Sequence, residues 1–91
     1  METIIIKEDI LFFLYCNHYF NKRHTPVYNV CNKLSYIPCK QIKKKLDNLY
    51  KLEIVGYKKT HHGKDVFFLN VRMKKEIENI ISDKLDALYS L

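Results

Sequence analysis

Glycine is scarce in this chain of 91 residues, and the two glycines, Gly56 and Gly63, do not form a glycine-rich phosphate-binding loop. The sequence also lacks an HExxH metalloprotease motif and a convincing pair of nucleophile and base. These absences argue against an enzyme. We therefore expect no catalytic residues and no cofactor.

Long hydrophobic runs are missing as well. The longest unbroken apolar stretch, Ile10 to Cys16, is far shorter than the roughly 20 residues that a membrane-spanning helix needs. The amino terminus opens with Glu2 and has no basic leader, so it does not resemble a secretion signal. We expect a cytoplasmic protein that does not enter membranes.

Cysteine occurs three times, and no pair has the CxxC spacing of zinc or redox sites. Reduced thiols are the default inside a cell, but intracellular proteins of hyperthermophiles do form disulfides. The sequence therefore does not decide whether any of the three cysteines forms a disulfide. Cys16 and Cys31 lie on apolar stripes and are expected in the core. Cys39 lies among lysines, which can depress the pKa of a thiol, so a redox-sensitive contact is the minor alternative for this residue. The neighbouring His61 and His62 have no carboxylate or thiol at ligand spacing, so we expect no metal site.

The composition is that of an ordinary globular chain, with 47% hydrophobic and 29% charged residues, and the length predicts one small domain. Its charge is unevenly distributed. Residues 22–64 contain eleven Lys and Arg against two acidic residues, a net charge of +9, whereas the two flanks together carry −3. A basic centre between acidic flanks favours a surface that binds a polyanion, although a lysine-rich helix can also be a merely solvated face.

Hydrophobic periodicity predicts two helices in the first third of the chain. Residues Ile4 to Phe20 are apolar almost all round a helical wheel, which is typical of a helix buried on several faces. Thr25 followed by Pro26 suits an N-cap with proline at the first helical position, and the second helix is expected to run to about Leu34.

A turn from Ser35 to Ile37 leads to a third helix that begins at Pro38. Ile42, Leu46 and Leu49 follow the i, i+4, i+7 pattern of a core stripe. Lys40, Lys44 and Lys51 fall on the opposite, outward face, with Gln41 and Asn48 beside them. Lys43 and Lys45 flank the apolar stripe on either side.

After Glu53 the pattern becomes that of β-strands. Ile54 to Thr60 and Asp65 to Val71 are rich in Val, Tyr, Phe and Thr and flank a short basic segment, which predicts a hairpin with a basic tip. From Met73 the helical period returns, with apolar residues on one arc of a single amphipathic helix. These apolar residues are Ile77, Ile80, Ile81, Leu85 and Leu88.

Four aromatic residues accompany the hairpin and the third helix. Aromatic rings can stack on bases, but beside a hairpin they more often pack between sheet and helix. We expect core packing for Tyr50, Tyr57, Phe67 and Phe68.

This order of elements is similar to that of the winged helix-turn-helix family of DNA-binding proteins. The segment PVYNVCNKLSYIPCKQIKKKLDNLYKLEIV looks like the two-helix unit of the family, and GYKKTHHGKDVFFLNV looks like its wing. The resemblance covers residues 25–71, about half of the chain. It implies a single α+β domain made of an N-terminal helix and loop (1–24), a helix-turn-helix (25–52), a wing (53–72) and a C-terminal dimerisation helix (73–91).

Two departures from the family pattern concern the third helix. Many members have glycine where this chain has Glu53, so we expect the helix to end without a left-handed cap. The turn before the helix is also one residue longer than the common version.

The resemblance implies a transcriptional regulator that binds double-stranded DNA and is similar to small dimeric regulators of archaea and their viruses or plasmids. A viral member would act in the host cytoplasm. The third helix would lie in the major groove, the wing would follow the backbone or the minor groove, and Thr25 would expose helix amides to a phosphate. The residues implied in DNA contact are Lys40, Gln41, Lys43, Lys44, Lys59, His61, His62, Lys64 and Thr25.

The resemblance also implies a homodimer. The first helix is more apolar than one small monomer can readily cover, and the C-terminal stripe offers it a partner across a two-fold axis. The expected interface residues are Ile6, Phe12, Phe13, Ile77, Ile81, Leu85 and Leu88.

An alternative stays open, because winged-helix domains also serve as protein-interaction modules of the transcription machinery. The basic face would then bind an acidic protein. The target DNA sequence, the direction of regulation and any small-molecule effector are left open by the sequence.

Overall fold

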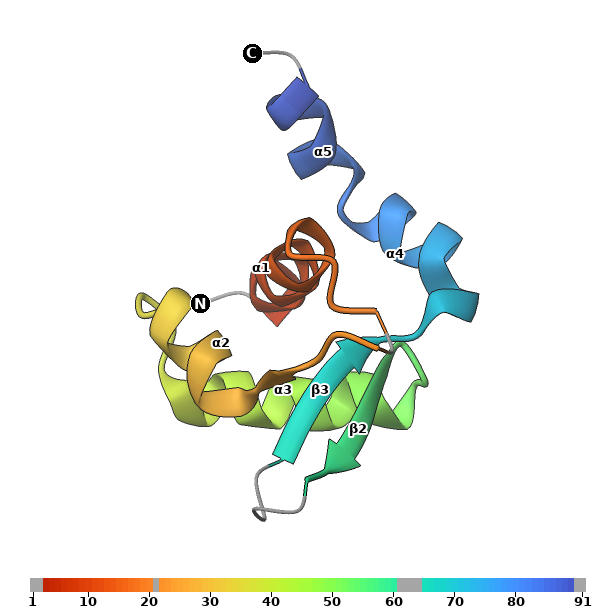
Figure 1. Cartoon of the computed structure of the whole chain (residues 1–91). Coiled ribbons are helices and arrows are strands. Elements are labelled where there is room, and N and C mark those ends of the chain that lie inside the picture. The colour runs from red at the N-terminus through yellow and green to blue at the C-terminus, as the bar shows by residue number, and fades with distance from the viewer. Residues whose placement is uncertain (1–2, 21, 61–64, 90–91) are drawn as a thin grey trace.

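The computed structural model describes residues 3–20, 22–60 and 65–89. Within these residues the protein is an α+β structure of five α-helices and a three-stranded antiparallel sheet (Figure 1), which confirms the α+β part of the predicted fold class. The elements in chain order are α1 (Thr3–Cys16), β1 (Thr25–Pro26), α2 (Val27–Lys33), α3 (Cys39–Lys51), β2 (Val55–Lys59), β3 (Asp65–Leu69), a 3₁₀ turn η1 (Val71–Met73), α4 (Lys74–Ile80) and α5 (Ser82–Tyr89).

The sheet has the strand order β1-β3-β2, and β2 and β3 pair along their whole length as the predicted hairpin. The strand β1 is only two residues long, with Thr25 opposite Phe67 and Pro26 opposite Val66. Because Pro26 has no N–H to donate, it is tolerated on this short edge strand.

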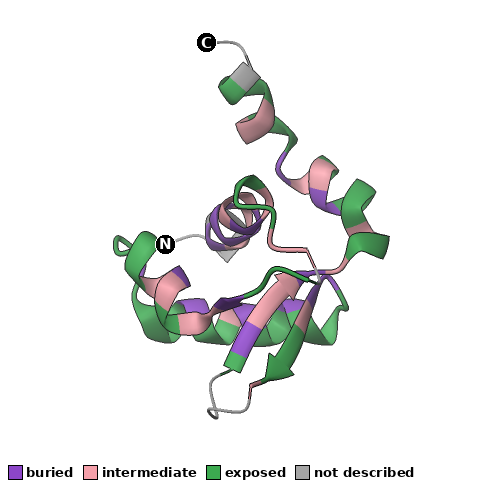
Figure 2. Ribbon diagram, in the orientation of Figure 1, coloured by how far each residue is buried: buried purple, intermediate pink, exposed green. Residues whose placement is uncertain are grey.

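The hydrophobic core lies where α1 meets α2, α3 and the sheet. Figure 2 shows buried positions on α1 and on the adjoining parts of α3 and β3, while the far end of the molecule at α5 is largely exposed or intermediate. Core residues that are less than 2% exposed come from α1, α2, α3, β3, α4 and the break after α4: Ile10, Leu11, Leu14, Val30, Ile42, Leu46, Leu49, Leu69, Ile77 and Ile81.

Helix α1 ends at Cys16, so the prediction of a helix up to Phe20 is wrong at this end. His18 takes a left-handed backbone conformation, with φ of 57°, and redirects the chain toward the sheet. There the N–H of Leu69 donates to the carbonyl oxygen of Tyr19 at 2.7 Å, and Phe20 forms a β-bridge with Leu69. Pairing with the end of β3 therefore decides where the helix stops.

Helix α3 ends with a left-handed residue that is not glycine. Glu53 has φ of 62°, its N–H donates to the carbonyl of Tyr50 at 3.0 Å, and the N–H of Ile54 donates to that of Leu49 at 3.0 Å. These two bonds are the Schellman motif, so the prediction that this helix lacks a left-handed cap is wrong. The side-chain amide of Asn70 donates to the Glu53 carbonyl at 2.8 Å, which helps to hold the strained residue.

The C-terminal segment is not the single helix that its periodicity predicts. It begins with η1 and is interrupted at Ile81, whose φ of −100° and ψ of 14° separate α4 from α5. Ser82 and Asp83 follow the break, and both residue types favour helix starts over helix interiors. As a result α5 extends away from the body of the protein, as Figure 1 shows.

Candidate functional site

Helix α3 has one face in the core and one face in solvent. Ile42, Leu46 and Leu49 are each at most 1% exposed, which confirms the predicted core stripe. Pro38 precedes the first residue of the helix, as expected for a residue that lacks a backbone N–H. Because the buried stripe fixes the rotation of the helix about its axis, the lysines between these positions must face outward.

The polar residues predicted for DNA contact on α3 are all exposed. They occupy the first half of the helix, next to the first-turn N–H groups that have no carbonyl partner within the helix. No negative residue lies among them in the first turn. The exposed set is Lys40, Gln41, Lys43 and Lys44.

One acidic residue of the same helix was not singled out from the sequence. Asp47 lies four residues after Lys43 and pairs with Lys51, whose Nζ is 3.2 Å from its carboxylate. Both side chains are more than 60% exposed, so the ion pair contributes little to stability. Its effect is on the surface charge, because it neutralises the second half of the helix and leaves the positive charge on the first half.

The hairpin extends beside α3 in Figure 1. Lys58 and Lys59 at the end of β2 are exposed, as is Asp65 at the start of β3. The predicted wing residues His61, His62 and Lys64 lie outside the described residues. Among the hairpin residues implied in DNA contact, Lys59 is therefore the one that the structure places.

An open groove separates α3 from the hairpin. Three aromatic rings follow one another along it, with centroids 5.7 Å apart for Tyr50 and Tyr57 and 5.5 Å apart for Tyr57 and Phe67. Tyr50 and Tyr57 are 47% and 38% exposed, so the prediction that they are core residues holds only in part. The groove is lined by Val27, Lys43, Asp47, Tyr50, Tyr57, Asp65 and Phe67.

The hydroxyl of Tyr57 is tied to the hairpin. It donates to the Asp65 carboxylate at 2.7 Å, and this hydrogen bond is the main reason why the pKa of Tyr57 is raised. Asp65 is the first residue of β3, so the bond links the start of this strand to the aromatic row. The sequence pattern does not reveal this pair, because Tyr57 and Asp65 lie on two different strands and only the register between β2 and β3 brings them together.

The prediction that Thr25 contacts DNA from the start of a helix is wrong. Thr25 is 1% exposed, belongs to β1 and not to a helix, and its Oγ1 accepts a hydrogen bond from the Asn29 side chain at 2.8 Å. Helix α2 starts after Pro26, which makes no side-chain cap hydrogen bond. The predicted cap fails because pairing with β3 keeps Thr25 and Pro26 extended, and a buried hydroxyl is poorly placed to reach a phosphate.

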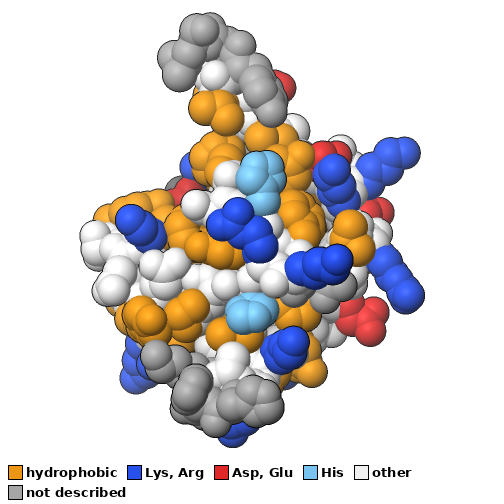
Figure 3. Space-filling view, in the orientation of Figure 1, with side chains coloured by type: hydrophobic (Ala, Val, Ile, Leu, Met, Phe, Trp, Pro, Cys, Tyr) orange, Lys and Arg blue, Asp and Glu red, His pale blue; other side chains and the backbone are white. Residues whose placement is uncertain are grey.

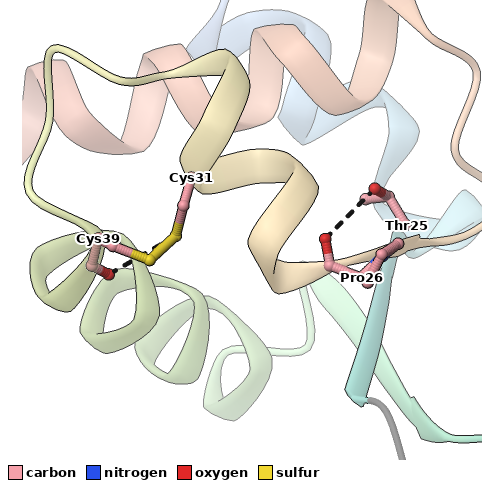
Figure 4. Close-up of a disulfide and its surroundings, with 4 residues drawn as sticks. All are labelled: Thr25, Pro26, Cys31 and Cys39. Carbon is pink, nitrogen blue, oxygen red and sulfur yellow. Dashed lines mark hydrogen bonds between the residues drawn. A yellow bond between two sulfur atoms is a disulfide. The ribbon is translucent and has the colours of Figure 1, made fainter. Parts of the chain in front are cut away.

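The cysteines also differ from expectation. Cys31 and Cys39 form a disulfide, with their Cα atoms 5.1 Å apart (Figure 4), so the expectation of reduced thiols is wrong for this pair. Cys16 was expected in the core but is exposed at the end of α1. The apolar stripe of α1 fails to bury Cys16 because the helix ends at this residue and the chain turns away.

A buried carboxylate connects α1 with the turn before α3. Asp9 on α1 is 8% exposed and accepts a hydrogen bond from the Tyr36 hydroxyl at 2.7 Å. Lys84 on α5 pairs with the other oxygen of the same carboxylate at 2.7 Å. Partial burial and the hydrogen bond to Asp9 raise the pKa of Tyr36 to about 12. Asp9 thus ties the turn of the two-helix unit to the C-terminal segment.

The residues expected at a dimer interface divide into three groups by burial. Ile6, Ile77 and Ile81 are at most 5% exposed and belong to the core of a single chain, so their side chains are not available to a partner. Leu88 is 46% exposed. The half-buried members are Phe12, Phe13 and Leu85.

Basic residues are not confined to α3. On the face drawn in Figure 3, Lys and Arg side chains are spread among hydrophobic ones, and acidic side chains are fewer. A test of α3 therefore needs a control that removes equal charge elsewhere.

No family model matches the chain, and no curated protein or solved structure is significantly similar to it. In the part of the chain that the structure describes, none of the helices has the length and apolar character needed to cross a membrane. Function must therefore be inferred from the residues of the site itself.

Proposed function

We propose that this protein is a winged helix-turn-helix regulator that binds double-stranded DNA as a homodimer. In this proposal α2, the following turn and α3 are the helix-turn-helix, and the β2–β3 hairpin is the wing. The observation that carries the proposal is the exposure of Lys40, Gln41, Lys43 and Lys44 on the first half of α3 while the apolar stripe of the helix is buried. The order of α1, β1, α2, α3, β2 and β3 is compatible with that fold.

The chemistry of the exposed residues suits duplex DNA. Lysine donates to N7 and O6 of guanine in the major groove, and glutamine bonds adenine through two hydrogen bonds. Lys40, Gln41 and Lys44 are the residues that we assign to base edges, while Lys43 faces the groove toward the hairpin and is suited to a phosphate.

The wing supplies the second contact. Lys58 and Lys59 are exposed at the end of β2 that leads into the tip, and the sequence of the tip adds two histidines and a lysine. Such a segment would contact the sugar-phosphate backbone or the minor groove. Thr25 is no longer part of the proposed contact surface, because it is buried.

The dimer interface in this proposal contains fewer residues than the sequence indicated. With Ile6, Ile77 and Ile81 inside one chain, the partner would contact Leu85 and Leu88 on α5 and the half-buried rings of α1. A two-fold axis through this region would place the two α3 helices in successive major grooves, about 34 Å apart. A near-palindromic binding site follows.

The first experiment measures the affinity of the purified protein for a labelled random duplex across a series of salt concentrations. We expect log K to fall linearly with log salt. A random duplex offers no specific bases, so on it Lys40 and Lys44 would neutralise phosphates. The double variant Lys40→Glu with Lys44→Glu should therefore weaken binding and flatten the slope by about 0.9 for each phosphate that it no longer neutralises.

The matched control is Lys74→Glu with Lys75→Glu, which changes the net charge equally on the exposed start of α4. If both double variants lose the same affinity, the contact is a general effect of charge and not a property of α3. Absence of duplex binding by the wild type at low salt would reject the proposal and would favour an acidic protein partner.

The dimer is tested separately by sedimentation equilibrium. Leu85→Asp with Leu88→Asp should convert a dimer into a monomer that keeps its circular dichroism spectrum, because neither residue is fully buried in the chain. A wild type that sediments as a monomer up to high concentration, or a footprint over a single asymmetric half-site, would reject the dimer without touching the DNA contact.

A further inference from the structure

The single disulfide among the described residues lies at the junction of the two helices that we assign to DNA binding. Cys31 lies in α2 and Cys39 is the first residue of α3, and only residues 34–38 connect the two helices. The covalent bond therefore closes the turn between them, as Figure 4 shows. One of its two cysteines, Cys39, is followed directly by Lys40 and Gln41.

The first turn of α3 has few other attachments. Pro38 at its N-cap position makes no side-chain cap hydrogen bond, and the turn is held by its own backbone, in which the N–H groups of Gln41 and Ile42 donate to the Pro38 carbonyl at 2.9 and 3.1 Å. Ile42 is the first side chain of the helix that reaches the core, and Cys39 itself is exposed. Within the part of the chain that the structure describes, the cross-link is thus the side-chain attachment that holds α3 ahead of Ile42.

The other residues between α2 and α3 attach this connecting segment to the core and to α1, and they do not hold the first turn of α3. Ile37 is 2% exposed and fills the core, while Tyr36 bonds to Asp9 on α1. Neither contact involves a cysteine. Loss of the disulfide would therefore free the first turn of α3 and leave the fold in place.

We propose that the Cys31–Cys39 bond is a redox-controlled clasp that fixes the first turn of α3. When it is closed, Lys40 and Gln41 are presented in one geometry. When it is open, the turn frays and these residues lose that geometry. The effect on DNA affinity rests on the proposed function, whereas the effect on the helix does not.

The reaction that opens the clasp is thiol–disulfide exchange with a small dithiol. A thiolate of the dithiol attacks the sulfur of Cys39, which is the more exposed residue, and Cys31 leaves as a thiolate that takes up a proton. The second thiol of the dithiol then attacks the mixed disulfide as a thiolate and releases Cys39. Two electrons and two protons pass to the protein, and the dithiol leaves as a cyclic disulfide. Oxidation by a small disulfide reverses these steps.

Thiol counting comes first. In the protein purified without reductant, alkylation followed by mass spectrometry should find one free thiol, that of Cys16, and three after treatment with dithiothreitol. Three free thiols even after incubation with oxidised glutathione would reject the clasp.

Helix order is the readout that does not depend on DNA. Amide hydrogen exchange of residues 42–44 should become about tenfold faster on reduction, while amides near Leu49 should keep their rates. The variant Cys31→Ser with Cys39→Ser should behave as the reduced wild type and ignore dithiothreitol. Cys16→Ser should behave as the wild type. Unchanged exchange at residues 42–44 would reject the clasp.

Duplex affinity is then measured for the same four samples. We expect the reduced protein and the double variant to bind a random duplex about fivefold more weakly than the oxidised wild type, since ordering the turn must now accompany binding. If amide exchange depends on the redox state but the oxidised and reduced forms bind the duplex with equal affinity, the role of the clasp in DNA binding is rejected. Redox-dependent exchange with no DNA binding by either form would reject the proposed function and leave the clasp on α3 intact.

Discussion

The two amphipathic segments of this protein, α3 and the C-terminal segment of α4 and α5, have similar apolar patterns and different surroundings. On α3 the whole stripe of Ile42, Leu46 and Leu49 is buried. On the C-terminal segment the stripe begins in the core at Ile77 and ends with Leu88, which is 46% exposed. Periodicity therefore identifies an apolar face, but whether that face is covered depends on how far the neighbouring elements extend.

The two segments are also held differently. Helix α3 lies against α1, α2 and β2, carries a disulfide at its start and ends in a Schellman motif. Helix α5 is attached through α4 and through the ion pair of Lys84 with Asp9. We expect α3 to unfold only with the whole domain and α5 to open locally at a lower free energy. The following predictions test this difference, starting with the largest effect.

The largest effect is expected in the core stripe of α3. Leu46→Ala should lower the free energy of unfolding by about 3 kcal/mol, because it removes a fully buried side chain and leaves a cavity. Leu88→Ala is the matched change on α5 and should cost less than about 0.5 kcal/mol at a concentration where the protein is monomeric. Urea denaturation of both variants measures the difference. Equal losses would show that α5 is as much a part of the core as α3.

The next effect concerns the carboxylate that connects the two regions. Asp9→Ala should cost about 2 kcal/mol, because it leaves the Tyr36 hydroxyl and the Lys84 ammonium without their common partner. It should also speed amide exchange in α5 while the amides of α3 change only with global stability. Hydrogen exchange followed by mass spectrometry separates the two regions, and a uniform change along the chain would contradict the local role of Asp9.

A gain is expected at the end of α3. Glu53→Gly should raise the free energy of unfolding by up to about 1 kcal/mol, because glycine adopts the left-handed conformation without strain. Lys51→Gly, two residues earlier and within the helix, should instead lower it by about 1 kcal/mol. Thermal denaturation of the pair checks the sign, and a loss with Glu53→Gly would mean that the carboxylate has a stabilising contact that outweighs the strain.

The smallest effect is a dependence on pH. The pKa of Tyr36 is raised from 10 to about 12 in the folded protein, so the folded state holds its proton more tightly than the unfolded state. The stabilisation is therefore complete below pH 10 and is lost as the pH rises toward 12. Because Tyr36 is 60% exposed, we expect a loss below about 1 kcal/mol.

The control for this prediction is Tyr36→Phe, which removes the titrating hydroxyl. Urea denaturation at about pH 9 and about pH 11, on either side of the ordinary tyrosine pKa, should show a smaller difference for this variant than for the wild type. An identical difference in both proteins would assign the pH dependence to other groups, such as the lysines.

Much of the fold was accessible from the sequence. Helices α2 and α3 and the hairpin follow from periodicity and from β-type composition, and the exposed residues of α3 follow from the position of its buried stripe. What failed were the features that depend on contacts between distant segments. Thr25 was expected to cap a helix and instead pairs with β3, and α1 was expected to continue beyond the point where Tyr19 bonds to Leu69.

Side-chain partners were harder still to predict from the sequence. The Cys31–Cys39 bond links two cysteines whose spacing matches no common motif, and it forms because the turn brings the ends of α2 and α3 together. The bond between Tyr57 and Asp65 and the shared carboxylate of Asp9 likewise join residues on different elements. A pattern along one chain carries little information about such pairs.

The sequence by itself determined which residues form an apolar face, which form strands, and where positive charge gathers, because these depend on residue type and spacing along the chain. Only the tertiary structure decided where the helices stop, which cysteines pair and which apolar residues stay exposed. Those outcomes depend on competition between local helix formation and contacts with distant segments, and in this protein β3 and the core decide that competition at His18, Thr25 and Ile81.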